Sequence, residues 1–407
     1  MDASFISFKQ FHGGGNVLKK MIRSNLEHFD DISSTKPQLQ KAKSIYSCYE
    51  LLYIKAFDFL FKLKQLYLLL VKYDVTNNET NTFIQKNKTT MKKVLITYAL
   101  NPEIAKELDG KVEYVIPEKS DFKRNEVMEM IADFDVIVPN FSFYTDKEMM
   151  DKGVKLELIS NFAVGFNNID VAYAKQKGIT VTNIPNSVTE PTAEFAFALL
   201  LAAGRRIGYY DRKIRIPQGL SWGLYDEPGL PIYGKSLGII GMGRIGQALA
   251  RRAVASGMTI MYHNRNRLDK SIENKYNARY VSLETLLRES DYVSLNAPST
   301  EKTIRMIGKK ELEMMKPTAV FINTARGNMV DEEALVHALK EKQIWAAGLD
   351  VFENEPKVSP LLLELDNVVL APHAATKTLE ARDEMGLEMI RNILGFYFDT
   401  YPISKVV

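Results

Sequence analysis

Residues 235–253, KSLGIIGMGRIGQALARRA, decide the fold of this chain. Gly241, Gly243 and Gly246 form a G-x-G-x-x-G pattern between an apolar strand and an alanine-rich helix. The first glycine permits a tight turn, the second a close approach of the backbone to a pyrophosphate, and the third close packing of helix on strand. The start of the helix offers free N–H groups and the positive end of its dipole to phosphate. The stretch therefore predicts a dinucleotide-binding unit.

Short apolar strands alternate with helical periods on both sides of this stretch, which is typical of an α/β fold with parallel sheets covered by helices. A first run of strands is predicted at 93–99, 112–117, 135–139, 156–160 and 179–184. A second run is predicted at 237–241, 258–263, 291–296, 318–323, 345–351 and 367–371. A long apolar helix, 192–207, separates the two runs, and a last helix, 377–398, returns from the second. The predicted domains are 91–190 plus 376–407 for substrate and 191–375 for the cofactor.

Composition separates the first ninety residues from the rest. Residues 1–90 hold 13 Lys and Arg against 8 Asp and Glu, whereas residues 91–407 hold 40 against 42. The longer part lacks the concentrated basic charge that nucleic acid binding requires. Residues 1–90 are predicted to be an extension of unknown role, either non-catalytic or a helical appendage that binds a partner or a membrane surface.

The cysteine count and the apolar segments further limit the class of protein. The single cysteine, Cys48, lies in the extension, so the body has no disulfide or thiolate metal site, and its three scattered histidines predict no metal site. The most apolar segment, 56–71, is interrupted by Lys62 and Lys64, so a membrane span is not expected. No secretory signal is apparent, and a cytoplasmic protein is predicted.

The strand at 258–263 ends in Asn264, Arg265 and Arg267. In NAD-binding proteins of this type, an Asp or Glu at this strand end binds the adenine ribose hydroxyls and would repel a 2′-phosphate. The neutral amide removes that repulsion, and guanidinium groups can bind phosphate bidentately. The pattern therefore favours NADP(H) as cofactor, with NAD(H) as the other possibility.

Downstream segments and the glycine turn together resemble the D-isomer-specific 2-hydroxyacid dehydrogenases, closest to the glyoxylate/hydroxypyruvate reductase branch. The segments are 321–356, FINTARGNMVDEEALVHALKEKQIWAAGLDVFENEP, and 367–382, NVVLAPHAATKTLEAR. The resemblance implies two Rossmann-like domains, one flavodoxin-like and one dinucleotide-binding, with parallel sheets and a cleft between them. It also implies NAD(P)H-dependent reduction of small 2-keto acids of the glyoxylate or hydroxypyruvate type to D-2-hydroxy acids.

The resemblance assigns a catalytic triad. Arg326 would bind and polarise the keto acid, His373 would give the carbonyl oxygen its proton, and Glu355 would bond the far imidazole nitrogen and fix its tautomer. Reduction of a 2-keto acid needs such a cation and proton donor beside a hydride source. All three follow predicted strands, at the edge where open α/β sheets bind ligands. The remaining histidines, His263 at a strand end and His337 in a helical period, are interpreted as structural.

The resemblance also assigns binding residues. The cofactor would contact the glycine turn, including Arg244 and Ile245, with the Thr324 and Ala325 backbone against the nicotinamide and Asp350 on its carboxamide. In the turn NFAVGFNN, 161–168, the N–H groups of Val164 and Gly165 would bind the substrate carboxylate. Family members often carry glycine where Ala163 stands, so this loop is expected to differ slightly. Phe141 and Ser142 are candidate residues at the mouth of the site.

Other classes remain open at this stage. The C-terminal-binding corepressors resemble this family and keep the triad while serving as cofactor-sensing interaction proteins. A short phosphoglycerate dehydrogenase is a further alternative, although no residues remain for the C-terminal regulatory domain that many of those enzymes carry. The enzyme is expected to be a homodimer joined through the apolar segment 194–214, EFAFALLLAAGRRIGYYDRKI.

Overall fold

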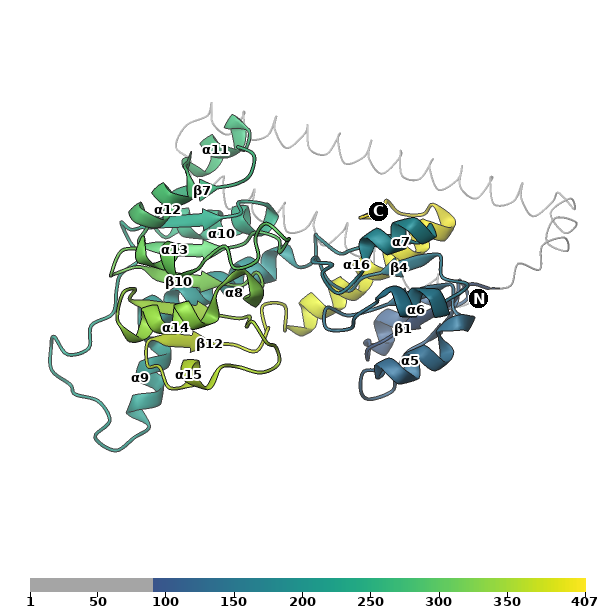
Figure 1. Cartoon of the computed structure of the whole chain (residues 1–407), viewed down its shortest axis with the longest axis horizontal. Coiled ribbons are helices and arrows are strands. Elements are labelled where there is room, and N and C mark those ends of the chain that lie inside the picture. Colours follow the sequence, from purple (N-terminus) through teal and green to yellow (C-terminus); the bar gives the residue numbers. More distant parts are fainter. Residues whose placement is uncertain (1–90) are drawn as a thin grey trace, which may run out of the picture. The chain divides into compact units, whose positions relative to one another are not determined.

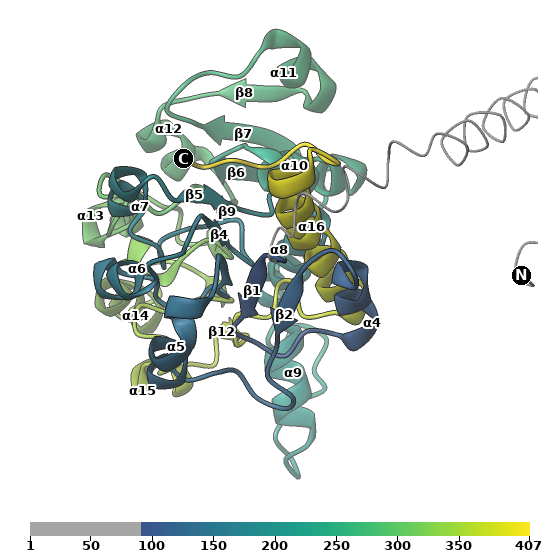
Figure 2. The same ribbon diagram turned by 90° about the vertical axis from the view of Figure 1, so that its right-hand side faces the viewer.

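A computed structural model describes residues 91–407, and the predictions for residues 1–90 lie outside these described residues. The described chain forms two parallel sheets, each with its own helices (Figures 1 and 2). The predicted α/β class with two parallel sheets is therefore confirmed. None of the helices within residues 91–407 is long and apolar enough to cross a membrane.

The first sheet has five strands in the order β2-β1-β3-β4-β5. Strand β1, which lies between β2 and β3, has the sequence KVLI, in which the three aliphatic side chains are fully buried, as expected for a strand covered on both faces. The strands are β1 (Lys93–Ile96), β2 (Glu113–Val115), β3 (Val136–Val138), β4 (Leu158–Ser160) and β5 (Thr180–Thr182). Each lies inside its predicted range.

Helices connect these strands and begin at recognisable caps. The Asp170 carboxylate accepts the Tyr173 N–H at the start of α7, and Gly178, with φ of +73°, ends that helix. The connecting helices are α4 (Pro102–Ala105), α5 (Arg124–Met130), α6 (Lys147–Lys152) and α7 (Val171–Lys177), with short 3₁₀ turns η1 (Lys106–Leu108) and η2 (Ile131–Asp133).

The second sheet has seven strands in the order β12-β11-β10-β9-β6-β7-β8. Six strands were predicted: β6 (Ser236–Ile240), β7 (Thr259–His263), β9 (Tyr292–Leu295), β10 (Val320–Asn323), β11 (Ala346–Leu349) and β12 (Val368–Leu370). The seventh, β8 (Ala278–Tyr280), was not predicted. It is a three-residue edge strand with an exposed Arg279 at its centre, so it has no apolar run to mark it.

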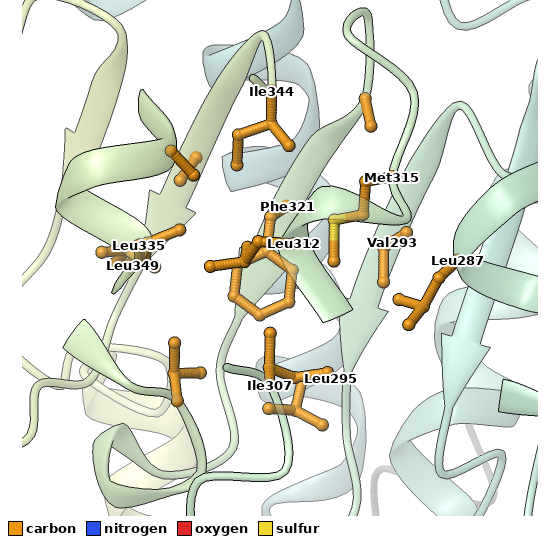
Figure 3. Close-up of a cluster of buried hydrophobic side chains, with 14 of the residues drawn as sticks. Leu287, Val293, Leu295, Ile307, Leu312, Met315, Phe321, Leu335, Ile344 and Leu349 are labelled. Atoms are coloured by element: carbon orange, nitrogen blue, oxygen red, sulfur yellow. The ribbon is translucent and has the colours of Figure 1, made fainter. Parts of the chain in front are cut away.

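The helices of this second part are α10 (Arg244–Ala255), α11 (Lys270–Tyr276), α12 (Leu283–Glu289), α13 (Lys309–Glu313), α14 (Glu332–Lys340) and α15 (Pro360–Leu363), with η3 (Gly327–Met329). Side chains from both sheet faces are buried beneath them. On one face Phe321 of β10 lies among Val293 and Leu295 of β9 and Leu312 of α13 (Figure 3). All four side chains are at most 1% exposed, which fixes the strand ends that carry the site.

Two long helices, α8 and α16, follow the first and second runs of strands. Helix α8 (Thr189–Gly204) begins three residues before its predicted start and packs against α10, β10 and β11 of the second sheet. It is followed by α9 (Ile207–Ile214). Helix α16 (Leu379–Phe398) returns to the first sheet (Figure 1). Its Met385, Met389 and Ile393 are buried in the core of that sheet. The predicted return of the last helix is thus observed.

Strand order places the ligand edge of each sheet. In the second sheet β6 pairs with both β7 and β9, so the connections diverge at β6 and β9. In the first sheet the same divergence occurs at β1 and β3. Open parallel sheets bind ligands beyond the carboxyl ends of strands at such points. The predicted site residues follow these strand ends.

Candidate active site

A cavity of about 490 Å³ lies at these strand ends and is lined from both sheets. Ten of the predicted site residues line it: Val164, Gly165, Gly243, Arg244, Ile245, Thr324, Ala325, Arg326, Asp350 and His373. Phe141, predicted at the mouth, also lines it. Ser142 does not line it, because its hydroxyl donates to Asn140 Oδ1 at 2.8 Å and is used within its own loop.

His373 and Glu355 form a hydrogen-bonded pair. Nδ1 of His373 lies 2.8 Å from Oε2 of Glu355, and the Phe352 N–H donates to the other carboxylate oxygen at 3.0 Å. Burial opposes ionisation of Glu355, but the hydrogen bond and the charge of His373, together with the Phe352 N–H, hold the pKa of Glu355 below its ordinary value. The ionised carboxylate therefore accepts the Nδ1 proton, which leaves Nε2 of His373 for chemistry in the cavity.

The loop that carries His373 is held by Asp350. His373 has a φ of +50°, a left-handed backbone conformation that few non-glycine residues adopt. The Asp350 carboxylate accepts the N–H groups of Ala374 and Ala375 at 2.6 and 3.0 Å, and its carbonyl accepts the His373 N–H at 2.8 Å. The Phe141 ring covers the imidazole with ring centroids 4.4 Å apart. Asp350 is fully buried and burial raises its pKa.

Arg326 follows β10 and extends to the substrate turn. Asn323 fixes the local backbone, because its amide accepts the Ala325 N–H and donates to the Arg326 carbonyl. The guanidinium donates to the Ala325 carbonyl at 2.6 Å, and no carboxylate lies within 4.0 Å of it among residues 91–407. A Cβ on Gly165 would lie 2.3 Å from Nη2, so a larger residue there would displace this guanidinium. Burial lowers the pKa of Arg326, although arginine stays protonated.

The substrate turn presents two backbone donors. Asn161 donates to the Gly165 carbonyl at 2.7 Å, and Asn183 donates to the Val164 carbonyl at 2.8 Å. The N–H groups of Val164 and Gly165 have no hydrogen-bond partner within the described chain. Two free N–H groups beside the Arg326 guanidinium form a site of the kind that binds a carboxylate. Ala163, where family members often carry glycine, is buried.

The glycine turn can accept a dinucleotide. Gly241 has a φ of +92°, and a Cβ there would lie 2.5 Å from the Ala297 nitrogen. A Cβ on Gly243 would meet no atom within 4 Å, and no side chain caps α10 at this residue. Gly246 packs against the Gly241 carbonyl. The first N–H groups of α10 therefore face open space, where a pyrophosphate fits.

Two buried oxygen atoms support the same fit. Asn296 Oδ1 and Thr324 Oγ1 have no hydrogen-bond partner within the described residues, and both residues line the cavity. Buried polar atoms are normally hydrogen-bonded, so partners from a bound molecule are expected. The residues present thus fit a nicotinamide dinucleotide. No group of His, Cys, Asp and Glu within residues 91–407 is arranged to hold a metal ion.

The end of β7 differs from the interpretation of its sequence. Asn264 Oδ1 accepts the Met242 N–H at 2.7 Å and so fixes the glycine turn. The Arg267 guanidinium is bound by Glu273 through Nε at 2.7 Å and Nη2 at 2.9 Å. The following helix thus supplies a carboxylate for Arg267, which the sequence did not predict, and the proposed contact of Arg267 with a 2′-phosphate remains a prediction. Arg265 is exposed and has no ion pair within the described part of the chain.

Glu273 is a buried carboxylate whose side chain is only 5% exposed, and its partners are Arg267, Lys270 and Tyr262. Hydrogen bonds from these groups lower its pKa from 4.5 to about 2. A lowered folded-state pKa contributes stability that is fully present above the unfolded value and is lost as the pH falls toward the folded value. We expect Glu273→Gln to lower the thermal midpoint at pH 7, and this difference from wild type to shrink steadily below pH 4.5.

Thermal melts between pH 7 and pH 3 measure this effect. Glu284→Gln is the control, because Glu284 belongs to an exposed ion pair with Arg288 on α12, and such pairs contribute little. A difference in thermal midpoint between Glu273→Gln and wild type that stays constant down to pH 3 would contradict the lowered pKa of Glu273.

Sequence analysis missed several residues of the cavity. Residues 296–300, the loop after β9, line it, and so do Thr189 and Thr192 of α8 and Arg382 of α16. The loop after β9 followed a predicted strand, so its place at the ligand edge was a usable signal. Thr189, Thr192 and Arg382 lie within helices, and their sequence gave no such signal of a place at the ligand edge. His263 lies at a strand end, as predicted, with Nδ1 3.0 Å from the Val281 carbonyl.

The fold and the site together define a nicotinamide-dinucleotide-dependent oxidoreductase. The glycine turn lies at the switch point of one parallel sheet. The same cavity is lined by Arg326, by His373 with its partner Glu355, and by two free N–H groups. Comparison with known proteins agrees. Residues 197–375 match the family model for the NAD-binding domain of D-isomer-specific 2-hydroxyacid dehydrogenases. The chain belongs to the D-isomer-specific 2-hydroxyacid dehydrogenase family.

Relatives and solved structures cover almost all of the described chain. A glyoxylate reductase of Thermococcus gammatolerans is 44% identical over 296 residues, which are 72% of this chain and 88% of that protein. One of Pyrococcus furiosus is 42% identical over 319 residues, 77% of this chain and 95% of that protein. The crystal structure of a glyoxylate reductase from Paecilomyes thermophila has a TM-score of 0.71 at 34% identity, covering 78% of this chain and 99% of that one. An NADPH-dependent glyoxylate/hydroxypyruvate reductase from Sinorhizobium meliloti, in complex with NADP and malonate, has a TM-score of 0.69 at 31% identity, covering 78% and 97%.

Proposed function

We propose that this protein reduces small 2-keto acids of the glyoxylate and hydroxypyruvate type to D-2-hydroxy acids with a reduced nicotinamide dinucleotide. The observation that carries the proposal is the facing pair of groups in one cavity: the Arg326 guanidinium beside the substrate turn, and the His373–Glu355 pair. When bound, the reduced cofactor supplies the hydride. The relatives named glyoxylate reductase support the substrate class.

Each chain residue has one task in this proposal. The free N–H groups of Val164 and Gly165, with Arg326, bind the substrate carboxylate, and Arg326 also polarises the carbonyl. His373 gives the proton on Nε2 to the carbonyl oxygen, and Glu355 stabilises the imidazolium and fixes its orientation. Asp350 is a positioning residue that holds the His373 loop. Its predicted contact with the nicotinamide carboxamide remains a prediction.

Thr324 and Ala325 line the cavity after β10, as a place against the nicotinamide requires. Gly241, Gly243 and Gly246, with Arg244 and Ile245, form the proposed pyrophosphate site. We further propose that residues 91–190 and 376–407 form the substrate domain and 191–375 the cofactor domain. The two separate sheets support this division.

The proposed preference for NADPH rests on Arg265. An exposed guanidinium without an ion pair is available for a 2′-phosphate, and the neutral Asn264 does not repel one. We expect Arg265→Ala to raise the KM for NADPH about 10-fold or more, which corresponds to one charge-assisted hydrogen bond, with little change for NADH. Initial rates with glyoxylate and hydroxypyruvate measure both constants. Arg288→Ala on α12, which removes an exposed arginine of an ion pair, is the control.

The same assay tests the function. Turnover of either keto acid supports the reductase, whereas tight cofactor binding without turnover would favour the cofactor-sensing corepressor type. Preferential turnover of a phosphorylated three-carbon acid would favour a short phosphoglycerate dehydrogenase. If Arg265→Ala raises the KM for NADPH and the KM for NADH by the same factor, the proposed role of Arg265 in NADPH preference is wrong.

A homodimer is also proposed. The segment after α8 exposes large apolar side chains in the single chain, and Trp222 and Leu224 are 87% and 89% exposed. Clustered exposed apolar residues mark interaction surfaces, and Ile207 and Ile214 of α9 lie at the start of the same segment. The molar mass in solution tests this proposal. A cytoplasmic location remains a prediction from the sequence.

A further inference from the structure

The charged groups that line the cavity do not balance. Arg244, Arg326 and Arg382 line it, and Asp350 is the one carboxylate among the lining residues. Both Asp350 oxygens accept backbone N–H groups from the loop after His373 and form no ion pair with an arginine. Three cations therefore face one carboxylate that is already engaged, which predicts anionic or oxygen-rich ligands.

The proposed function accounts for two of these cations. Arg244 begins α10 beside the glycine turn, where the dinucleotide phosphates are proposed to bind. Arg326 lies against Gly165 of the substrate turn and is assigned to the carboxylate and carbonyl of the keto acid. Arg382 has no assigned partner.

Arg382 lies in the first turn of α16 (Leu379–Phe398). Within residues 91–407 its guanidinium makes one side-chain hydrogen bond, from Nη1 to the Met385 sulfur at 4.0 Å, and no carboxylate lies within 4.0 Å. The next residue, Asp383, is instead bound by the Asn101 amide at 2.9 Å. Arg382 is half-buried, and this burial lowers the pKa of its guanidinium. A half-buried cation without a carboxylate partner faces the cavity, so an acceptor atom of a ligand is expected to satisfy it.

The oxygen atoms of the keto acid, compared with the donors of the site, indicate which ligand atom Arg382 binds. The Val164 and Gly165 N–H groups and Arg326 already serve the carboxylate. His373 and Arg326 serve the carbonyl oxygen. Glyoxylate has no further oxygen and no third carbon, whereas hydroxypyruvate carries a hydroxyl on C3. We infer that Arg382 is a specificity-determining residue that donates a hydrogen bond to an oxygen on C3 of the 2-keto acid.

This inference rests on the proposed function and deepens it: the site favours three-carbon 2-keto acids with a C3 oxygen over glyoxylate. A hydrogen bond from a charged donor changes discrimination by about 10- to 100-fold. We expect Arg382→Met, which keeps an apolar stem, to lower kcat/KM for hydroxypyruvate by that factor and to leave kcat/KM for glyoxylate within about threefold.

The measurement is the ratio of the two kcat/KM values at saturating cofactor, for the full chain. Arg391→Met is the matched control, since it is the same exchange nine residues later on α16, at an ion pair with Glu384 that does not line this cavity. Its ratio is expected to equal that of wild type. A merely structural role of Arg382 would lower both activities together and leave the ratio unchanged.

Two results would overturn the inference. Equal losses for glyoxylate and hydroxypyruvate in Arg382→Met would place this arginine on the shared carboxylate or in the scaffold. If that variant does not fold, Arg382→Gln replaces it, and an unchanged ratio there has the same meaning. A wild-type protein that reduces neither acid would instead remove the proposed function, and this inference with it.

Discussion

Arg326→Ala is expected to lower kcat/KM for keto-acid reduction by at least about 1,000-fold, because it removes a buried cation from both the carboxylate and the developing negative charge on the carbonyl oxygen. The guanidinium of Arg326 is packed directly against Gly165 of the substrate turn. Cofactor binding is expected to stay nearly intact, since Asn323 holds the backbone of this loop through contacts that the substitution leaves in place. Steady-state rates and a fluorescence titration with NADPH measure the two effects separately.

Arg326→Lys separates charge from geometry. Lysine keeps the positive charge but lacks the planar fork that binds a carboxylate bidentately, so an intermediate loss of activity is expected. An Arg326→Ala protein that binds NADPH normally and keeps more than about a tenth of the wild-type kcat/KM would show that Arg326 has only a structural role, because removing one preorganised donor alone costs about 100-fold. Weak cofactor binding in the same variant would point to collapse of the loop after β10.

Much of the fold was predictable because periodicity and strand ends are local properties. The glycine turn follows β6 as predicted, and its Gly241 has the positive φ that the pattern requires. His373 and Arg326 follow β12 and β10, and parallel strands bring their carboxyl ends to one edge whatever their separation in sequence. Strand β8 was missed because three residues at a sheet edge, one of them an exposed arginine, carry no apolar signal.

The functions of side chains were less predictable, because they depend on partners from other elements. Arg267 was predicted as a phosphate ligand, and α11 supplies Glu273, whose carboxylate binds the same guanidinium. Asn264 avoids repelling a phosphate as expected, but its amide is also used to hold the Met242 N–H. Arg382 is the last residue of the quoted segment 367–382 and had no role assigned to it, and the return of α16 brings it to the cavity. A single sequence fixes none of these pairings.

His373→Ala is expected to lower kcat for reduction by about 100-fold or more while changing the KM for keto acid little, because proton transfer is lost and carboxylate binding is kept. Glu355→Gln should give a smaller loss, because it removes the carboxylate that accepts the Nδ1 proton at 2.8 Å but keeps the imidazole. His337→Ala is the control, because that histidine is exposed on α14. If kcat is the same in His373→Ala and wild type, another group supplies the proton and the Glu355–His373 pair serves only to hold the loop.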